Sequence, residues 1–260
     1  METKPISILI GMPIFENVPV EQFQALLMIQ RWAMERTPMI QLTFSTPQRT
    51  TLVQARNQII RDFVEGEYTY LLRLDDDNPP HDPYFSIEKM LDFMKSNKDV
   101  HVVSALIKSR DDSHYTIYSS VGEIGYDTPQ YIPFLPPLTG NKYKPFIADA
   151  VGFGMVLMDR ESVEVISKKY NNNPVAQWTM IYVRITPEKE WEDPKVVELA
   201  DAFFYHGWKT MDSKFSMVDL SENFIFRSRL TLINEKYKPR ILPDIQCFHI
   251  AKKYVSCDLK

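Results

Sequence analysis

The sequence predicts an α/β fold with a mostly parallel central sheet and flanking helices. Short apolar runs, typical of strands buried on both faces, alternate with segments whose apolar residues recur at helical spacing. The connections between these segments are short, as in doubly wound sheets built from strand–helix–strand units. No repeat or linker divides the 260 residues, so we expect a single domain over residues 1–260.

Four strands and three helices are expected in the first half of the chain. The predicted strands are apolar or alternating runs, at 6–12, 40–44, 68–72 and 102–107. The predicted helices carry apolar residues at steps of three and four, at 20–36, 50–65 and 82–96. In the first helix the recurring residues are Phe23, Leu26, Leu27, Ala33 and Met34. The third helix begins at Asp82-Pro83, because aspartate caps helices well and proline fits the first turn.

The second half of the chain has a weaker pattern. A strand over 150–158 contains Gly152-Phe153-Gly154, and a helix over 160–170 follows it. Residues 109–148 hold many Tyr, Pro, Ser and Asp, so we expect long loops with short strands there. Residues 174–217 are rich in aromatic side chains but have no clear period.

Two further elements complete the predicted fold. Residues 221–237 place apolar side chains at helical spacing, with Tyr237 as the last of them. Residues 241–248 form an apolar run that we expect to be a strand, and His249 follows it directly.

Composition argues against several classes of protein. The net charge of -4 gives no general affinity for nucleic acid or for an anionic membrane. Only two cysteines occur, Cys247 and Cys257, so no disulfide framework is expected. The first residues lack the apolar run of a signal peptide, and no apolar run reaches the ~18 residues of a transmembrane helix. We therefore expect a soluble, cytoplasmic protein; the sequence leaves the oligomeric state open.

The most informative stretch is the apolar run 68–74 followed by Asp75-Asp76-Asp77 and Asn78-Pro79-Pro80. Three adjacent carboxylates repel one another, and burying them is costly unless a cation offsets their charge. Carboxylate oxygens suit hard divalent ions such as Mg²⁺ and Mn²⁺. Open α/β sheets also bind ligands at the carboxyl ends of their strands. The run therefore predicts a metal and phosphate site, with a turn after Leu74 that lets Asp75 and Asp77 face one ion.

Two other interpretations of the acidic run stay open. A solvated turn that caps the next helix would also place Asp before Pro. A phosphatase of the haloacid dehalogenase type has Asp-x-Asp after an apolar strand as well. In that family, however, Thr or Val usually follows the second Asp and the strand is the first, whereas here Asn78 follows and the strand is the third.

Several motifs follow one another along the chain between Ile8 and Ile250. They are Arg56-Asn57, Asp75-Asp76-Asp77, the segment Gly152 to Arg160, Ser221-Glu222-Asn223 and Cys247-Phe248-His249. In this order they resemble the GT-A glycosyltransferases that use nucleotide sugars, of the family 2-like kind with an Asp-x-Asp motif. The resemblance implies a GT-A fold over 1–260, with a nucleotide- and metal-binding half at 1–110 and an acceptor-binding half at 111–260.

The resemblance implies that Mn²⁺ or Mg²⁺ bridges the diphosphate of the donor. Asp77 and His249 would be direct ligands, Asp75 would share the metal or touch the ribose, and Asp76 would lie near the nucleotide. Such an ion acts as a Lewis acid that neutralises the departing nucleoside diphosphate. Without the resemblance, a lone histidine beside an apolar strand would be read as an ordinary core residue.

Six residues would surround the nucleotide if the resemblance holds. The first two would line the base pocket, the middle pair would contact the nucleotide, and the last two would meet the diphosphate. Arginine suits this role because its planar fork pairs with carboxylate or phosphate; solvated surface charge is the alternative for the basic residues. The six are Pro13, Ile14, Arg56, Asn57, Lys108 and Arg110.

The catalytic base is the open question of the predicted site. In inverting relatives the late motif commonly reads Glu-Asp, and the Asp deprotonates the acceptor hydroxyl. Here Asn223 occupies that place, and an amide cannot act as a base. Either Glu222 or Asp219 takes the role, or the enzyme is retaining and needs no such base.

We therefore expect a metal-dependent glycosyltransferase that moves a sugar from a nucleoside diphosphate donor to a hydroxyl acceptor, a glycan or glycoconjugate. Two alternatives stay open: a catalytically degenerate GT-A domain that binds glycan or nucleotide, and a metal-dependent phosphohydrolase or nucleotidyltransferase. The donor sugar, nucleobase and acceptor are not specified by the sequence.

Overall fold

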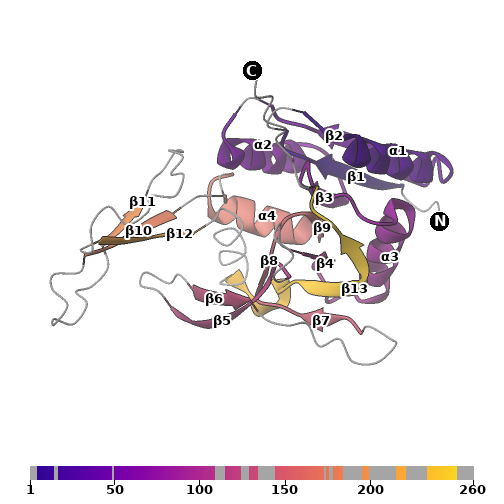
Figure 1. Ribbon diagram of the computed structural model, residues 1–260. Coiled ribbons are helices and arrows are strands. Elements are labelled where there is room, and N and C mark those ends of the chain that lie inside the picture. The colour runs from indigo at the N-terminus through magenta and orange to yellow at the C-terminus, as the bar shows by residue number, and fades with distance from the viewer. Residues whose placement is uncertain are drawn as a thin grey trace, which may run out of the picture.

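The structure is a computed structural model, and it describes residues 5–14, 17–48, 50–108, 115–123, 129–133, 144–172, 174–175, 178–183, 195–198, 215–220 and 233–250. Its centre is a seven-stranded sheet between two layers of helices (Figure 1). In spatial order the strands are β2 (Ile40–Ser45), β1 (Ile6–Gly11), β3 (Tyr70–Leu74), β9 (Met155–Asp159), β4 (Val102–Ile107), β13 (Arg240–Cys247) and β7 (Phe146–Ile147).

Five of these seven strands run in the same direction. β2, β1 and β3 pair in parallel, and so do β4 and β13. β9 lies between β3 and β4 and is antiparallel to both, while β7 is antiparallel to β13 at the sheet edge. The predicted α/β fold with a mostly parallel central sheet is therefore confirmed. The sequence did not predict that a strand of opposite direction lies in its middle.

The predicted strand over 150–158 is two strands rather than one. β8 (Ala150–Val151) belongs to a small antiparallel sheet with β5 (Ile117–Glu123) and β6 (Pro129–Pro133). The chain then passes through Gly152-Phe153-Gly154 and enters the central sheet as β9. The glycines allow this change of sheet, because glycine tolerates a bend and a close backbone approach within a strand pattern.

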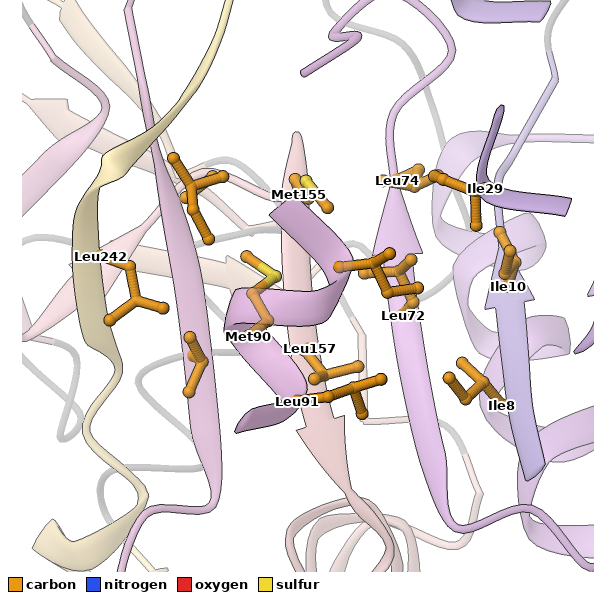
Figure 2. Close-up of a cluster of buried hydrophobic side chains, with 14 of the residues drawn as sticks. Ile8, Ile10, Ile29, Leu72, Leu74, Met90, Leu91, Met155, Leu157 and Leu242 are labelled. Carbon is orange, nitrogen blue, oxygen red and sulfur yellow. The ribbon is translucent and has the colours of Figure 1, made fainter. Parts of the chain in front are cut away.

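The helices cover opposite faces of the central sheet. α1 (Val20–Met34) and α3 (Pro83–Ser96) pack on one face, and α2 (Leu52–Glu65) and α4 (Arg160–Lys169) pack on the other. Figure 2 shows the first face, where Met90 and Leu91 of α3 meet Leu72 and Leu157 of the sheet. Because strand side chains alternate, Leu71 packs on the second face instead.

Side chains of the preceding residues begin three of these helices. Thr51 and Gln54 form a reciprocal capping box at α2. Asp82 accepts a hydrogen bond from Phe85 N at 2.9 Å and Pro83 follows, as predicted for α3. Asp159 caps α4 in the same way, through Ser162 N.

The apolar spacing correctly located α1 but did not identify its buried face. The side chains that face the sheet are those of Ala25, Ile29, Trp32 and Ala33, together with Gln22. Three of the recurring residues that predicted the helix are exposed instead; the exposed fractions are 54% for Phe23, 52% for Leu27 and 66% for Met34. α1 is therefore apolar on two faces.

Two regions of the second half were not specified correctly or fully by the sequence pattern. The aromatic-rich region, which has no clear period, contributes to a separate antiparallel sheet of β11 (Lys195–Glu198), β10 (Trp178–Val183) and β12 (Phe215–Leu220). The helix predicted over 221–237 does not continue to Tyr237. Residues 221–232 lie outside the described part of the chain, and a short 3₁₀ helix, η1 (Glu235–Tyr237), begins after an extended Asn234 that caps it.

In the part of the chain that the structure describes, no helix has both the length and the apolar character needed to cross a membrane.

Candidate functional site

The acidic run forms a turn at the carboxyl end of β3, as the sequence predicts. Asp75 follows the last residue of the strand, and Asp76 and Asp77 lie in the turn. The backbone N–H of Asp75 donates to the carbonyl oxygen of Gly154 at 3.3 Å, which holds the turn against the start of β9. A Cβ on Gly154 would lie 3.1 Å from Cβ of Asn78. Only glycine therefore allows the turn to approach the start of β9 this closely without displacing a neighbour.

A short antiparallel ladder joins the acidic turn to the end of β13. Ile250 N donates to Asp77 O at 2.9 Å, Phe248 N to Pro79 O at 3.3 Å, and His81 N to Gln246 O at 3.0 Å. Pro80 lies opposite Cys247, and the same register places Asn78 opposite His249. A bulge in β13 between Leu242 and Gln246 precedes the ladder and redirects the strand. Residues about 170 positions apart in sequence are therefore fixed side by side.

The ladder places the two predicted metal ligands next to each other. Nδ1 of His249 lies 3.7 Å from Oδ1 of Asp77, and the exposed fractions of the two side chains are 16% and 9%. A separation of 3.7 Å is too long for a hydrogen bond. Nδ1 of His249 is buried and makes no hydrogen bond in the structure. A buried imidazole nitrogen next to a carboxylate oxygen, with no hydrogen bond between them, is an arrangement in which one cation can bind both.

Asn78 orients the carboxylate of Asp77. Its Nδ2 donates to Oδ1 of Asp77 at 2.6 Å, and its side chain is almost wholly buried. Its Oδ1 has no hydrogen-bond partner. A buried amide that donates to a ligand carboxylate is the type of outer contact that fixes the geometry of metal sites.

Asp77 and His249 could hold a divalent cation only together with further ligands from a substrate or water. Within the described residues, no group of three or more His, Cys, Asp or Glu side chains is arranged to hold a metal. Asp77 and His249 would supply two ligands. Mg²⁺ typically takes one or two protein carboxylates and completes its octahedron with substrate phosphates and water, and Mn²⁺ accepts similar oxygen-rich sites.

A buried arginine pairs with the first carboxylate of the run. Nη2 of Arg56, on α2, donates to Oδ1 of Asp75 at 2.9 Å, and the exposed fractions are 3% and 21%. The Arg56 guanidinium lies 4.9 Å from the ring centroid of Phe153, and that of Arg73 lies 4.5 Å from it. Sequence reasoning included Arg56 and missed Arg73, although a charged residue inside an otherwise apolar strand was a visible signal.

The remaining predicted nucleotide residues fall into two groups. Pro13, Ile14 and Lys108 follow the parallel strands β1 and β4, so they lie at the same sheet edge as the acidic turn. Ile14 is tied to the end of β2 through Ile14 N and Pro47 O. Asn57 is buried, and its amide donates to Val175 O and accepts from Val175 N, both at 2.9 Å. Asn57 therefore holds the chain after α4.

Of the three remaining predicted residues, which are the two candidates for the catalytic base and one cation expected at the diphosphate, only one lies in the described part of the chain. Asp219 is in β12, opposite Thr179 of β10. Glu222 and Arg110 lie outside the described residues.

The chain was compared with known proteins. No family model matches it, and no curated protein matches it. Among solved structures it is similar to A197 from STIV, with 13% identity, coverage of 94% of this chain and 85% of that chain, and a TM-score of 0.48. It is also similar to CMP:2-keto-3-deoxy-manno-octonic acid synthetase complexed with CTP, with 10% identity, coverage of 64% and 78%, and a TM-score of 0.33. At these identities and TM-scores the likenesses carry no conclusion about activity.

Proposed function

We propose that the protein is a metal-dependent glycosyltransferase of the GT-A type, which transfers a sugar from a nucleoside diphosphate sugar to a hydroxyl acceptor. The observation that carries the proposal is the pair of Asp77 and His249 at the carboxyl end of the sheet: Oδ1 of Asp77 lies 3.7 Å from Nδ1 of His249, with no hydrogen bond between the two atoms. The pair combines the acidic motif with the late histidine that the sequence resemblance links to it.

The metal, Mn²⁺ or Mg²⁺, would be held by Asp77 and His249 and would supply Lewis-acid stabilisation of the leaving diphosphate. Asn78 would keep the Asp77 carboxylate in its ligating orientation. Arg56 occupies Oδ1 of Asp75, so in the proposal Oδ2 of Asp75 accepts a hydrogen bond from the ribose.

The donor would lie across the carboxyl ends of β1, β3 and β4. Pro13 and Ile14 would flank the base, with Asp76 near the nucleotide, and Lys108 together with Arg110 would approach the diphosphate. Cations there complement the departing nucleoside diphosphate, because it carries more negative charge than one divalent ion offsets once its bond to the sugar has broken.

The proposed transfer forms one bond to the anomeric carbon of the sugar and breaks another. The acceptor hydroxyl oxygen forms a bond to the anomeric carbon, the bond from that carbon to the diphosphate oxygen breaks, and the electron pair stays with the diphosphate. The hydroxyl proton passes to Glu222 or Asp219 in an inverting reaction, or to the leaving phosphate oxygen in a retaining one. The two routes give opposite anomeric configurations in the product.

The experiment is a panel assay for released nucleoside diphosphate. The protein is incubated with UDP-, GDP- and TDP-sugars in the presence of Mn²⁺ or Mg²⁺, with and without EDTA. We expect one donor to be hydrolysed slowly in the absence of acceptor, and EDTA to stop the reaction. The anomeric configuration of the released sugar, read by NMR, distinguishes the inverting from the retaining route.

Three outcomes would contradict the proposal. Metal-dependent release of phosphate from simple phosphomonoesters would indicate a phosphohydrolase. Formation of a nucleotide sugar from a nucleoside triphosphate and a sugar phosphate would indicate a nucleotidyltransferase. Donor binding without turnover of any panel member would indicate a degenerate domain.

A further inference from the structure

The outer face of α1 is an apolar surface that no other described part of the chain covers. We call it the outer seam and define it as the exposed apolar residues that lie opposite the buried face of the helix. Their exposed fractions range from 52% to 68%. The outer seam consists of Val20, Phe23, Leu27 and Met34.

The spacing of the outer seam is typical of a helix that packs along another helix. Val20, Leu27 and Met34 are seven residues apart, and Phe23 lies three residues after Val20. This is the heptad spacing that keeps one stripe of a helix facing a partner helix over successive turns. Phe23, Leu27 and Met34 were among the residues that predicted the helix from sequence, and the fold buries the other side of it. An apolar seam of this length on a helix already packed against its sheet indicates a second packing partner.

The outer seam is also symmetric about its centre. Val20 and Met34 each lie seven residues from Leu27, while Phe23 and Arg31 each lie four residues from it. If two copies of α1 pack antiparallel across a two-fold axis at Leu27, Leu27 meets its own copy and Val20 meets Met34 of the second copy. Phe23 then meets Arg31 of the second copy, an arrangement that allows a cation–π contact. A two-fold interface requires such self-complementarity.

The exposed area agrees with a dimer contact at the small end of the usual range. The outer seam offers four exposed apolar side chains. At roughly 80–100 Å² apiece they expose about 300–400 Å². A stable interface buries about 800 Å² on each partner, of which the apolar core is a little over half. Polar exposed residues at its rim, such as Gln24 and Glu35, would supply the rest.

Charge favours a protein partner over a lipid surface. The exposed charged side chains on and next to the helix are Glu21, Arg31 and Glu35, and Arg31 already pairs with Glu35 at 3.0 Å. Anionic membranes attract helices with an excess of lysine and arginine, and this helix has one glutamate and one arginine.

We propose that the protein forms a two-fold dimer through the outer seam, with α1 of one copy antiparallel to α1 of the second. The contact lies on the face of the sheet that α1 and α3 cover, and it uses no residue of the acidic turn. It is therefore independent of the proposed activity.

The test is analytical ultracentrifugation of the full chain between about 1 and 100 μM, a range in which interfaces of this size dissociate. We expect the wild type to sediment as a dimer in the upper part of this range. Leu27→Glu places two carboxylates face to face on the axis and should raise the dissociation constant by at least about 100-fold. Ile147→Glu is the matched control, since Ile147 is 51% exposed on β7 and should leave the dimer intact.

A second variant tests the geometry itself. Leu27→Cys should form an intermolecular disulfide in mild oxidant, because a residue on a two-fold axis faces its own copy, whereas Ile147→Cys should not. A wild type that is monomeric at 100 μM overturns the proposal, and so does a dimer unaffected by Leu27→Glu. Flotation of a monomeric wild type with phosphatidylcholine–phosphatidylserine vesicles, abolished by Leu27→Glu, would assign the seam to a lipid surface instead.

Discussion

Replacing Asn78 by alanine tests how the Asp77 carboxylate is held. The substitution removes a 2.6 Å hydrogen bond from a buried amide to the carboxylate that we propose as a metal ligand. Hydrogen bonds to charged groups contribute about 1.5–3 kcal/mol, and one factor of ten in affinity corresponds to about 1.4 kcal/mol. We therefore expect the affinity for Mn²⁺ to fall by about 10- to 100-fold, in line with losses seen for outer contacts in metal sites.

The same substitution should change stability much less than metal affinity. The lost hydrogen bond costs about 1.5–3 kcal/mol. Against this, the variant no longer buries Oδ1 of Asn78, which has no partner and whose desolvation costs about 1–3 kcal/mol. The two effects largely offset each other, so urea unfolding should shift by no more than about 1 kcal/mol.

The assay is electron paramagnetic resonance of free Mn²⁺ during titration of the protein. Gln246→Ala is the control, because Gln246 belongs to the same ladder but its side chain is exposed; its affinity should equal that of the wild type. If Asn78→Ala binds Mn²⁺ within about twofold of the wild type, Asn78 does not position the ligand. If the wild type binds no Mn²⁺ at all, the proposed metal site itself is wrong.

Two substitutions near the site and one in a surface ion pair can be tested in the same way. Asp77→Ala should abolish metal-dependent turnover while circular dichroism stays unchanged; retained activity would contradict the site assignment. Gly154→Ala should lower the free energy of unfolding by about 1–3 kcal/mol, measured by urea denaturation, because its Cβ would lie 2.7 Å from Cδ1 of Ile107; an unchanged midpoint of urea unfolding would show that Ile107 and Asn78 shift at no cost. The hydrogen bond from Lys236 holds the pKa of Glu161 below its ordinary value. The stability that ionised Glu161 contributes is therefore present at neutral pH and is lost as pH falls below about 4. The free energy of unfolding of Glu161→Gln should therefore fall less between pH 7 and pH 3 than that of the wild type. Equal losses would show that the ionisation of Glu161 does not contribute to stability.

Local chemistry explains why the elements around the site could be predicted. The apolar runs of β1, β3 and β4 and the cap at Asp82-Pro83 depend on neighbouring residues only, so they are readable from the sequence. The position of the acidic run is equally local, because it directly follows β3. The structure agrees with each of these predictions to within two or three residues.

Long-range packing explains what could not be predicted. Nothing in the spacing of Phe23 and Leu27 states which side of α1 meets the sheet, because both sides are apolar and only the sheet decides between them. The same holds for Asn57, whose two hydrogen bonds go to Val175, a residue that α4 brings to α2. The end of the last predicted helix was missed for a local reason instead: Ile233 is helical, but the Asn234 side chain caps a short 3₁₀ turn over the residues that follow.

The sequence by itself determined the α/β class, most strand and helix positions, and the placement of three carboxylates at a strand's carboxyl end. Only the tertiary structure decided that β9 enters the sheet in the opposite direction and that Asp77 lies beside His249. Periodicity and caps are set by interactions between residues a few positions apart. The contact between Asp77 and His249 depends on backbone hydrogen bonds between 77–81 and 246–250, and those form only once the sheet has brought the two segments together.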